Sequence, residues 1–177
     1  MKKYAVIVVD MLNDFVTGPM ASPRVKTIIE PIRELCAKAR KQGIPIIYTN
    51  DSHTPELDTE FKLWGPHAVE GTKGAKVIDE LKPKKGDIII PKKTYSAFFG
   101  TPLSLILKEH GVDTLIITGW QSDCCCRHTA ADAFFRGFDL IVPKETTDTT
   151  NEKAYKNSME DMKVFYGANL CSVKDLF

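Results

Sequence analysis

Residues 114–133, TLIITGWQSDCCCRHTAADA, predict a buried strand that breaks at a glycine, turns and continues as a helix. Leu115, Ile116 and Ile117 form a short apolar run before Gly119, and alanines at helical spacing begin at 130. The cysteines between them fall in the first turn of that helix. Unpaired N–H groups and the helix dipole favour a thiolate there and lower a cysteine pKa. We therefore expect a cysteine nucleophile at this corner.

Three adjacent cysteines, Cys124, Cys125 and Cys126, compete for that role. Any one of them alone is roughly twice as often a small buried hydrophobe as a catalytic group. A zinc site built from all three is less expected, because adjacent side chains point in different directions and metal-binding thiolates are usually spaced further apart. The residue types alone leave open which of the three is the nucleophile.

Length, charge and composition limit the kinds of protein that this chain can be. A chain of 177 residues forms most economically one domain, 1–177, with a substantial core. A formal net charge of +1 gives no electrostatic basis for binding nucleic acid. The apolar run at 4–9 is too short to span a membrane and no export signal follows it. We therefore expect a cytoplasmic protein whose five cysteines are reduced thiols.

Short apolar runs alternate with longer amphipathic runs along the chain, which is typical of an α/β protein. Strands are predicted at 4–10, 45–50, 87–91, 113–119, 139–143 and 169–173. Helices are predicted at 22–41, 75–81, 101–110, 125–136 and 152–166, with a long loop at 51–71. The alternation predicts a three-layer α/β/α sandwich around a mainly parallel sheet. The isoleucines at 88–90 predict that the strand at 87–91 is buried on both faces.

Chemically reactive residues stand at the ends of four predicted strands: Asp10, then Asp51 and His53, then Lys92, then the cysteines. Each has an ordinary explanation alone, because Asp at a strand end is usually a turn residue and Lys there is usually a solvated charge. Open parallel sheets, however, place their sites at the carboxyl ends of the strands. The coincidence of four such ends predicts an active site at that edge.

Three motifs resemble those of the isochorismatase-like cysteine hydrolases, whose best-known members are the nicotinamidases. Residues 119–129, GWQSDCCCRHT, resemble G-V-A-T-D-x-C-V-x-x-T; residues 10–15, DMLNDF, resemble D-x-Q-x-D-F; and residues 92–101, KKTYSAFFGT, resemble K-x-x-Y-S-A-F-x-G-T. The resemblance covers nearly the whole chain and implies the isochorismatase-like hydrolase fold. It also implies a catalytic triad of Asp10, Lys92 and Cys125.

The chemistry of such a triad follows from the residue types. A carboxylate can take the thiol proton and later pass it to a departing amine, and a nearby ammonium stabilises the thiolate. Asp10 is therefore expected to be the base and then the acid. The resemblance further implies an oxyanion hole from the backbone N–H groups of Gln121 and Cys125, after a cis Trp120–Gln121 peptide. Trp120 stands where the family usually has a small β-branched residue.

The loop at 51–71 carries a second set of candidate residues. Asp51 and His53 alternate on an extended segment, so both side chains can face one way, and His67 can close a site from across the loop. Carboxylate and imidazole suit zinc, manganese or iron(II), although spacing alone gives metal binding about even odds. Nicotinamidases carry D-x-H, a later P-H and then G-T-x-G-A, which the stretch 51–75 matches. The resemblance thus implies these three residues as ligands of a divalent metal, first of all zinc, with Glu60 where some members supply a fourth.

Aromatic residues complete the implied site. Phe15, Trp64 and Tyr95 match positions that form the walls around the substrate ring in nicotinamidases, where stacking and apolar burial hold a flat ring. Each of the three also has an ordinary structural explanation as a core residue. The residues that differ from the family near this pocket leave the reacting groups in place and bear on which amide fits: Leu12, Ser52, Ala68 and Ser122.

The expected function is a metal-containing cysteine amidohydrolase, most simply a nicotinamidase that forms nicotinate and ammonia through a Cys125 thioester and serves NAD salvage. A related amidohydrolase acting on an N-carbamoyl compound or a small aliphatic amide would keep the triad and need not keep the metal. An isochorismatase proper cleaves a vinyl ether and needs neither thiol nor metal. A redox or metal-storage protein would need neither Asp10 nor Lys92. Relatives often form dimers or tetramers, so we expect a homo-oligomer that binds a small amide, with no nucleic-acid or membrane partner.

Overall fold

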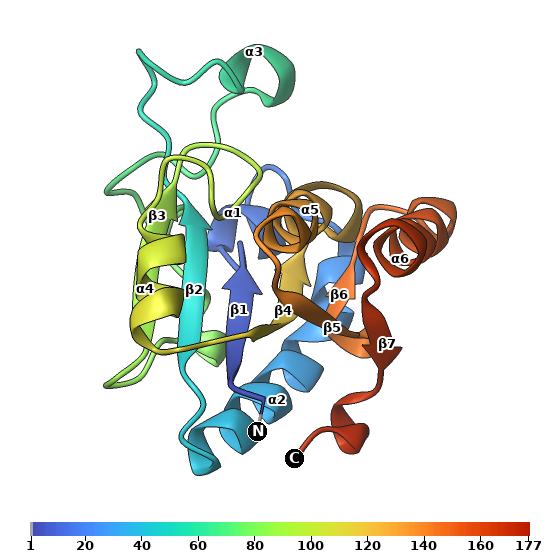
Figure 1. Ribbon diagram of the computed structural model, residues 1–177. Coiled ribbons are helices and arrows are strands. Elements are labelled where there is room, and N and C mark those ends of the chain that lie inside the picture. The colour runs from blue at the N-terminus through green and yellow to red at the C-terminus, as the bar shows by residue number, and fades with distance from the viewer. Residues whose placement is uncertain (1) are drawn as a thin grey trace.

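The computed structural model describes residues 2–177, which form a seven-stranded sheet with helices on both faces (Figure 1). The strands lie in the order β3-β2-β1-β4-β5-β7, the short β6 pairs with the end of β4, and every pairing is parallel. The strand bounds are Tyr4–Val9 (β1), Ile46–Asp51 (β2), Ile88–Lys92 (β3), Thr114–Trp120 (β4), Asp139–Pro143 (β5), Thr147–Asp148 (β6) and Asn169–Cys171 (β7). The predicted α/β sandwich with a parallel sheet is confirmed.

Helices cover both faces of this sheet. In the view of Figure 1, α4, α5 and α6 lie in front of the sheet and α2 lies behind it. The helix bounds are Asn13–Val16 (α1), Ile29–Lys41 (α2), Phe61–Trp64 (α3), Leu103–Glu109 (α4), Arg127–Phe135 (α5) and Glu152–Tyr166 (α6). A 3-10 segment, Pro23–Ile28, leads into α2, and the Ser22 side chain caps it by accepting from Arg24 N.

Strand β1 anchors both layers. Its side chains alternate between the two cores, with Val6 and Val8 packing among residues of α2 and Ala5, Ile7 and Val9 packing among residues of α4, α5 and α6. All five are fully buried. Because a buried Val or Ile side chain contributes about 1.5–3 kcal/mol, this strand ties the two layers together at the centre of the sheet.

Most predicted elements agree with the structure to within two residues, and the ranges of β5 and α6 coincide with the predicted ones. The prediction of a helix at 75–81 is wrong, because only Asp79–Leu81 form a 3-10 turn. The residues before that turn pair with the chain after β1 instead: Asn13 N donates to Lys76 O, and Ile78 N donates to Met11 O. The helix predicted to start at Cys125 begins with a π-helical turn, Ser122–Cys126, that continues into α5.

Strand β3 is not buried on both faces, contrary to the prediction. It is an edge strand that pairs with β2 alone among the described strands, and Ile89 is 56% exposed while Ile90 is buried. An apolar run of this length does not distinguish an edge strand from a central one. The parallel pairing with β2 matters for the site, because it places the carboxyl end of β3 beside the carboxyl end of β2.

Between β2 and β3 the chain leaves the sheet, and α3 projects beyond the carboxyl ends of the strands (Figure 1). Pairing of His53 with Val69 closes the base of this excursion. His53 N donates to Ala68 O, and Glu70 N donates to His53 O, both at 2.9 Å. Periodicity does not predict α1, α3 or β6, because these elements have only 4, 4 and 2 residues.

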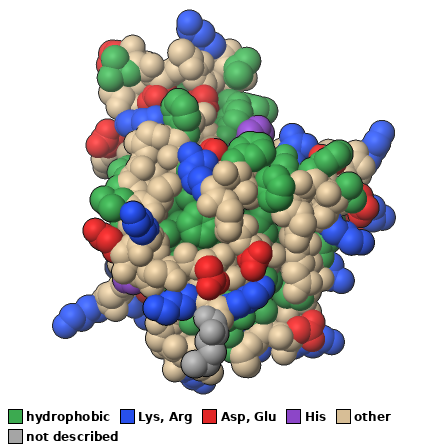
Figure 2. Space-filling model, viewed as in Figure 1, with side chains coloured by type: hydrophobic (Ala, Val, Ile, Leu, Met, Phe, Trp, Pro, Cys, Tyr) green, Lys and Arg blue, Asp and Glu red, His purple; other side chains and the backbone are tan. Residues whose placement is uncertain are grey.

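The surface is mixed in character. Acidic and basic side chains are interspersed over the face shown in Figure 2. Apolar side chains gather where α5 and α6 end, in an aromatic patch with exposed fractions of 46–72%: Phe134, Phe135, Val164 and Phe165. Among the helices of residues 2–177, none combines the length and the apolar composition that crossing a bilayer requires.

Candidate active site

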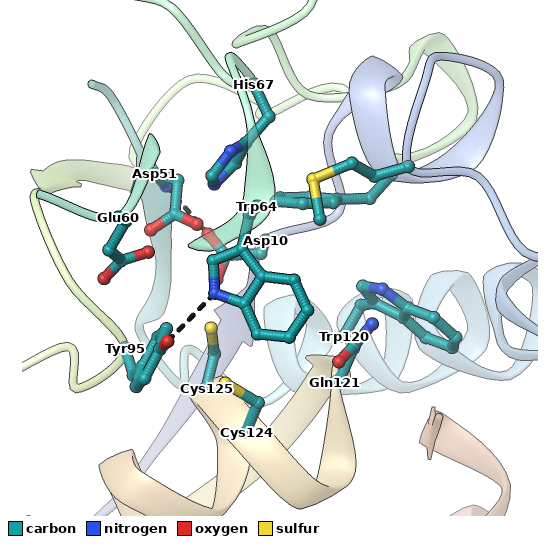
Figure 3. Close-up of a pocket in the computed structure, with 12 residues that line it drawn as sticks. Asp10, Asp51, Glu60, Trp64, His67, Tyr95, Trp120, Gln121, Cys124 and Cys125 are labelled. Atoms are coloured by element: carbon teal, nitrogen blue, oxygen red, sulfur yellow. Dashed lines mark hydrogen bonds between the residues drawn. The ribbon is translucent and has the colours of Figure 1, made fainter. Parts of the chain in front are cut away.

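The strand ends bring the predicted catalytic residues to the carboxyl end of the sheet, and Figure 3 shows Asp10 and Cys125 in the same pocket. Strands β2 and β3 pair Asp51 directly with Lys92. Asp10 follows β1, which lies between β2 and β4, and Cys125 follows β4. Side-chain atoms of Asp10, Asp51 and Cys125 lie within 4.8 Å of one another. Because Lys92 is paired with Asp51, the structure brings together the three residues of the predicted triad, Asp10, Lys92 and Cys125.

Lys92 lies at the centre of this group and is fully buried. Its Nζ is 2.7 Å from Asp10 Oδ2 and 3.7 Å from Cys125 Sγ, and it also donates to Asp51 Oδ1. Burial lowers the pKa of Lys92, but the two carboxylates outweigh burial and raise the pKa well above its usual value. Lys92 is therefore an ammonium at any physiological pH. The neighbouring Lys93 is half-exposed and lies against Glu70.

Asp10 is positioned by its backbone and by one hydrogen bond. Its φ is +50°, and its Oδ1 accepts the N–H of Asp51 at 2.7 Å. Burial and the charge of Asp51 raise the pKa of Asp10 to about 7, against the opposing effect of Lys92. A carboxyl group that titrates near neutrality can both accept and return a proton.

The structure separates the three cysteines. Cys126 is buried with its Sγ 3.9 Å from Thr118 O, and burial raises its pKa to about 12. Cys124 lines the cavity, and hydrogen bonding with Cys125 and with His128 lowers the pKa of Cys124 to about 6. Cys125 also lines the cavity and is the cysteine that contacts the central ammonium.

The pKa of Cys125 is raised, contrary to the expectation for a thiol at a helix start. The neighbouring Cys124 and burial raise it, and the Lys92 ammonium opposes them. The carboxylates of Asp10 and Asp51 add to the rise, so the helix dipole does not dominate here. Cys125 therefore rests as a thiol and needs a base within reach when it attacks.

The turn before the nucleophile is fixed by close packing. Gly119 has a φ of +112°, and a Cβ there would lie 2.0 Å from Val9 O, so the position requires glycine. The Trp120–Gln121 peptide is cis. Gln121 and Cys125, whose N–H groups are the predicted oxyanion donors, both line the cavity.

The four predicted metal ligands also converge. Asp51, His53, Glu60 and His67 are buried and offer donor atoms within 4.8 Å of one another. His53 Nε2 lies 3.7 Å from Asp51 Oδ2 and 3.8 Å from Glu60 Oε2. The imidazole rings of His53 and His67 have centroids 4.6 Å apart.

This donor set fits a divalent cation. Both ring nitrogens of His53 and Oε1 of Glu60 are buried without a hydrogen-bond partner among the described residues, a situation that is rare in folded proteins. Burial raises the pKa of Glu60, and the charge of Asp51 adds to the rise, as expected where carboxylates outnumber cations. Two imidazoles with carboxylates suit zinc, manganese or iron(II). These residues would hold the ion.

Two further carboxylates support the cluster and were not predicted. Asp58 Oδ2 lies 3.5 Å from His53 Nδ1. Asp14 Oδ2 accepts from Ala68 N at 2.8 Å and so fixes the backbone beside His67. The second aspartate of the D-x-Q-x-D-F motif was a signal for Asp14, whereas nothing in the local sequence singled out Asp58.

One cavity joins the thiol, the ligand cluster and the predicted aromatic walls. It holds about 390 Å³ of empty space, part of it open to solvent. Phe15, Trp64 and Tyr95 all line it, and Trp64 Nε1 donates to Tyr95 Oη at 2.9 Å (Figure 3). Two lining residues that sequence reasoning did not assign to the pocket are Met20 and Trp120.

A sequence profile of the isochorismatase domain matches residues 4–175. The chain belongs to the isochorismatase family. N-carbamoylsarcosine amidase of an Arthrobacter species is 33% identical over 80% of this chain, which spans only 58% of that relative's length. Nicotinamidase 3 of Arabidopsis thaliana is 29% identical over 89% of this chain and 79% of its own.

Solved structures of the family agree with these relatives. N-carbamoylsarcosine amidase from Thermoplasma acidophilum has a TM-score of 0.91 and 38% identity, over 97% of this chain and 96% of its own. The pyrazinamidase of Pyrococcus horikoshii in complex with zinc has a TM-score of 0.89 and 30% identity, over 96% of this chain and 99% of its own. The chain therefore belongs to a family that includes amidohydrolases, and the relatives it resembles are named for different amides.

Proposed function

We propose that this isochorismatase-family protein is a metal-dependent nicotinamidase that hydrolyses nicotinamide to nicotinate and ammonia. The observation that carries the proposal is that three residues of the buried four-residue donor cluster, Asp51, Glu60 and His67, line one aromatic-walled cavity together with the Cys125 thiol. Nicotinamide has a matching part for each. Its ring nitrogen suits a bound ion, its flat face suits aromatic side chains, and its carboxamide carbon suits a thiol nucleophile.

The side chains of this protein can perform both half-reactions. Asp10 takes the Cys125 proton as Sγ bonds to the carboxamide carbon, and the N–H groups of Gln121 and Cys125 bind the oxygen that becomes negative. Asp10 passes the proton to the amide nitrogen, the C–N bond breaks, and ammonia leaves a thioester on Cys125. A water molecule that gives a proton to Asp10 then attacks the thioester, and Asp10 returns that proton to the sulfur as nicotinate leaves. Lys92 remains charged and holds Asp10 in place.

Asp51, His53, Glu60 and His67 would hold a divalent ion, which would supply Lewis-acid chemistry toward the ring nitrogen of the substrate. The cluster and the triad share one side chain, because Asp51 Oδ1 accepts from Lys92 while Oδ2 faces His53 Nε2. Asp51 therefore positions the ammonium and contributes to the ligand cluster at the same time. This shared carboxylate is a physical reason to expect metal loss to affect the triad as well as substrate binding.

The charge of the cavity favours a neutral substrate. Among the described residues that line it, Asp10, Asp51 and Glu60 are acidic and none is Lys or Arg. The buried ammonium of Lys92 is already paired with two carboxylates. A carboxylate on the substrate would thus lose its hydration with no cationic side chain to receive it, and only an ion held by the ligand cluster could offset that cost. Nicotinamide is uncharged at neutral pH and avoids that cost.

A second candidate is hydrolysis of an N-carbamoyl compound, because the 38% identity to the Thermoplasma acidophilum structure exceeds that to the pyrazinamidase. Its scissile bond is the terminal C–N bond of a urea group rather than of a carboxamide, but that group also presents a carbonyl carbon and releases ammonia, so the same triad would serve. N-carbamoylsarcosine, however, carries a carboxylate and has no ring to lie against Phe15 and Trp64. The two candidates therefore differ in the charge and flatness that the cavity must accept.

The test is ammonia release from nicotinamide and from N-carbamoylsarcosine by purified zinc-loaded protein. We expect release from nicotinamide that disappears in Cys125→Ala and persists in Cys171→Ala, a half-buried cysteine outside the cavity. Chelation should lower the rate, and added zinc, manganese or iron(II) should restore it. Release from N-carbamoylsarcosine alone would replace the nicotinamidase proposal with the second candidate.

A further inference from the structure

The indole of Trp120 carries a polar group that the proposed reaction does not use. Trp120 is 1% exposed, and its Nε1–H has no hydrogen-bond partner among the described residues. A buried indole N–H usually has a partner, because burial removes the one it had in water. The other tryptophan of the chain, Trp64, follows that rule through its hydrogen bond to Tyr95.

Trp120 lines the cavity from the carboxyl end of β4. Figure 3 shows its indole across the cavity from Asp51 and Glu60, with the nitrogen-bearing ring turned toward the interior. The backbone of Trp120 is paired with Asp148 of β6, and its ring packs into the core on the α2 side of the sheet. The donor is therefore held in place before any ligand binds.

We infer that Trp120 is a specificity-determining residue whose Nε1–H donates to a neutral acceptor on the substrate edge that faces away from the metal ligands. The inference rests on the proposed function, because it takes the scissile carboxamide at Cys125 and a ring nitrogen toward the ligand cluster as given. A neutral donor without a cationic side chain beside it suits a ring nitrogen or a carbonyl oxygen. A buried donor left unpaired by one substrate and paired by another discriminates between them.

Nicotinamide and pyrazinamide form a matched pair of probes for this donor. Nicotinamide has one ring nitrogen, so when that nitrogen faces the ligand cluster the opposite edge presents only C–H groups. The two ring nitrogens of pyrazinamide lie para to each other, so the second nitrogen then faces the Trp120 side. An ordinary hydrogen bond corresponds to a factor of about 2–12 in a rate or equilibrium constant. We expect Trp120 to favour pyrazinamide over nicotinamide by a factor of this order.

The kinetic test compares kcat/KM for the two amides in zinc-loaded wild-type protein and in Trp120→Phe, which keeps an aromatic ring and removes the N–H. The ratio of pyrazinamide to nicotinamide should fall about fivefold in Trp120→Phe. Trp64→Phe is the matched control, because it removes the indole N–H that already binds Tyr95. That variant should change both amides alike and leave the ratio unaltered. An unaltered ratio in Trp120→Phe would overturn the inference.

A second measurement does not depend on turnover or on Trp120→Phe folding well. The chain has 2 tryptophans, so ¹⁵N-labelled indoles give two side-chain signals that Trp64→Phe assigns. In zinc-loaded Cys125→Ala, saturating pyrazinamide should move the Trp120 Nε1–H proton downfield, and saturating nicotinamide should move it less. Equal shifts with both amides contradict a hydrogen bond to the second nitrogen.

Failure of the inference and failure of the proposed function give different results. If wild-type protein hydrolyses neither amide, the proposed function fails and the inference falls with it. If wild-type protein hydrolyses both, and the Trp120 variant and the indole signal do not distinguish them, the nicotinamidase proposal stands and the role of Trp120 alone is wrong.

Discussion

Replacing Lys92 with methionine removes the single charge that faces two buried carboxylates. Asp10 and Asp51 are 1% and 3% exposed, and both contact the Lys92 ammonium. Removing one partner of a buried ion pair typically costs about 3–5 kcal/mol, because the remaining charge is left without compensation. With two carboxylates left unpaired, we expect Lys92→Met to lower the free energy of unfolding by at least about 3 kcal/mol.

Lys93→Met is the matched control for this change. The Lys93 side chain is 49% exposed and its Glu70 partner is 66% exposed, so solvent screens the pair and about 0–1 kcal/mol is expected. Urea unfolding followed by circular dichroism, in buffer with a chelator, measures both variants without a contribution from bound metal. Adding Asp10→Asn to Lys92→Met should recover more than about 1 kcal/mol, because it removes one of the two unpaired charges.

The pH dependence gives an independent check on the same reasoning. The pKa of Asp10 is already raised to about 7 in the wild-type protein, and loss of Lys92, which lowers it, must raise it further. A carboxyl group whose pKa is raised by folding destabilises the protein increasingly as pH rises. The decrease in the free energy of unfolding caused by Lys92→Met should therefore be larger at pH 8 than at pH 5. If Lys92→Met lowers the free energy of unfolding no more than Lys93→Met does at both pH values, the carboxylates of Asp10 and Asp51 are not left as uncompensated charges, and the reasoning is refuted.

Three further changes have expected outcomes. Gly119→Ala should destabilise the fold by about 1–3 kcal/mol or more in urea unfolding, because its Cβ would meet the backbone of Val9 at 2.0 Å; a neutral result would mean that β1 and β4 can separate. His53→Ala should lose stoichiometric metal by elemental analysis while Cys125→Ala keeps it, and equal metal content in both would remove His53 from the ligand set. We propose that a second copy of the chain covers the aromatic patch, because its four apolar side chains are 46–72% exposed side by side. Phe135→Ser with Phe165→Ser should then convert an oligomer into a monomer by light scattering, and a monomeric wild-type protein would show that the patch has another role.

The architecture was predictable because it depends on patterns that repeat. Apolar runs of strand length separated by amphipathic runs define the sheet and its helices whatever the details of each residue. Reactive residues at successive strand ends then predict one site, since parallel strands bring those ends together. Asp51 and Lys92 illustrate this, because 40 residues separate them and register pairs them directly.

What the sequence did not predict depends on neighbours that are distant along the chain. The exposure of Ile89 follows from the edge position of β3. The raised pKa of Cys125 follows first from Cys124 and from burial beneath other elements, and the carboxylates of Asp10 and Asp51 add to it. The pairing of 76–78 with 11–13 replaced a helix that local composition favoured. The role of Asp58, and the lack of a partner for the Trp120 N–H among residues 2–177, become visible only once the cavity and its walls are assembled.

The closed base of the excursion between β2 and β3 has a consequence for how this enzyme can be diversified. Because His53 is tied to Ala68 and Glu70 by backbone hydrogen bonds, the ligands at either end of the loop stay in register whatever the intervening segment does. Lengthening a flexible loop costs little, about 0.6 kcal/mol for each doubling. Residues 54–66, which carry Trp64 to the mouth of the cavity, therefore form an exchangeable cassette once Asp58 and the ligand Glu60 are kept. New amide preferences are best sought in libraries of that cassette, with the chemical machinery beneath it left intact.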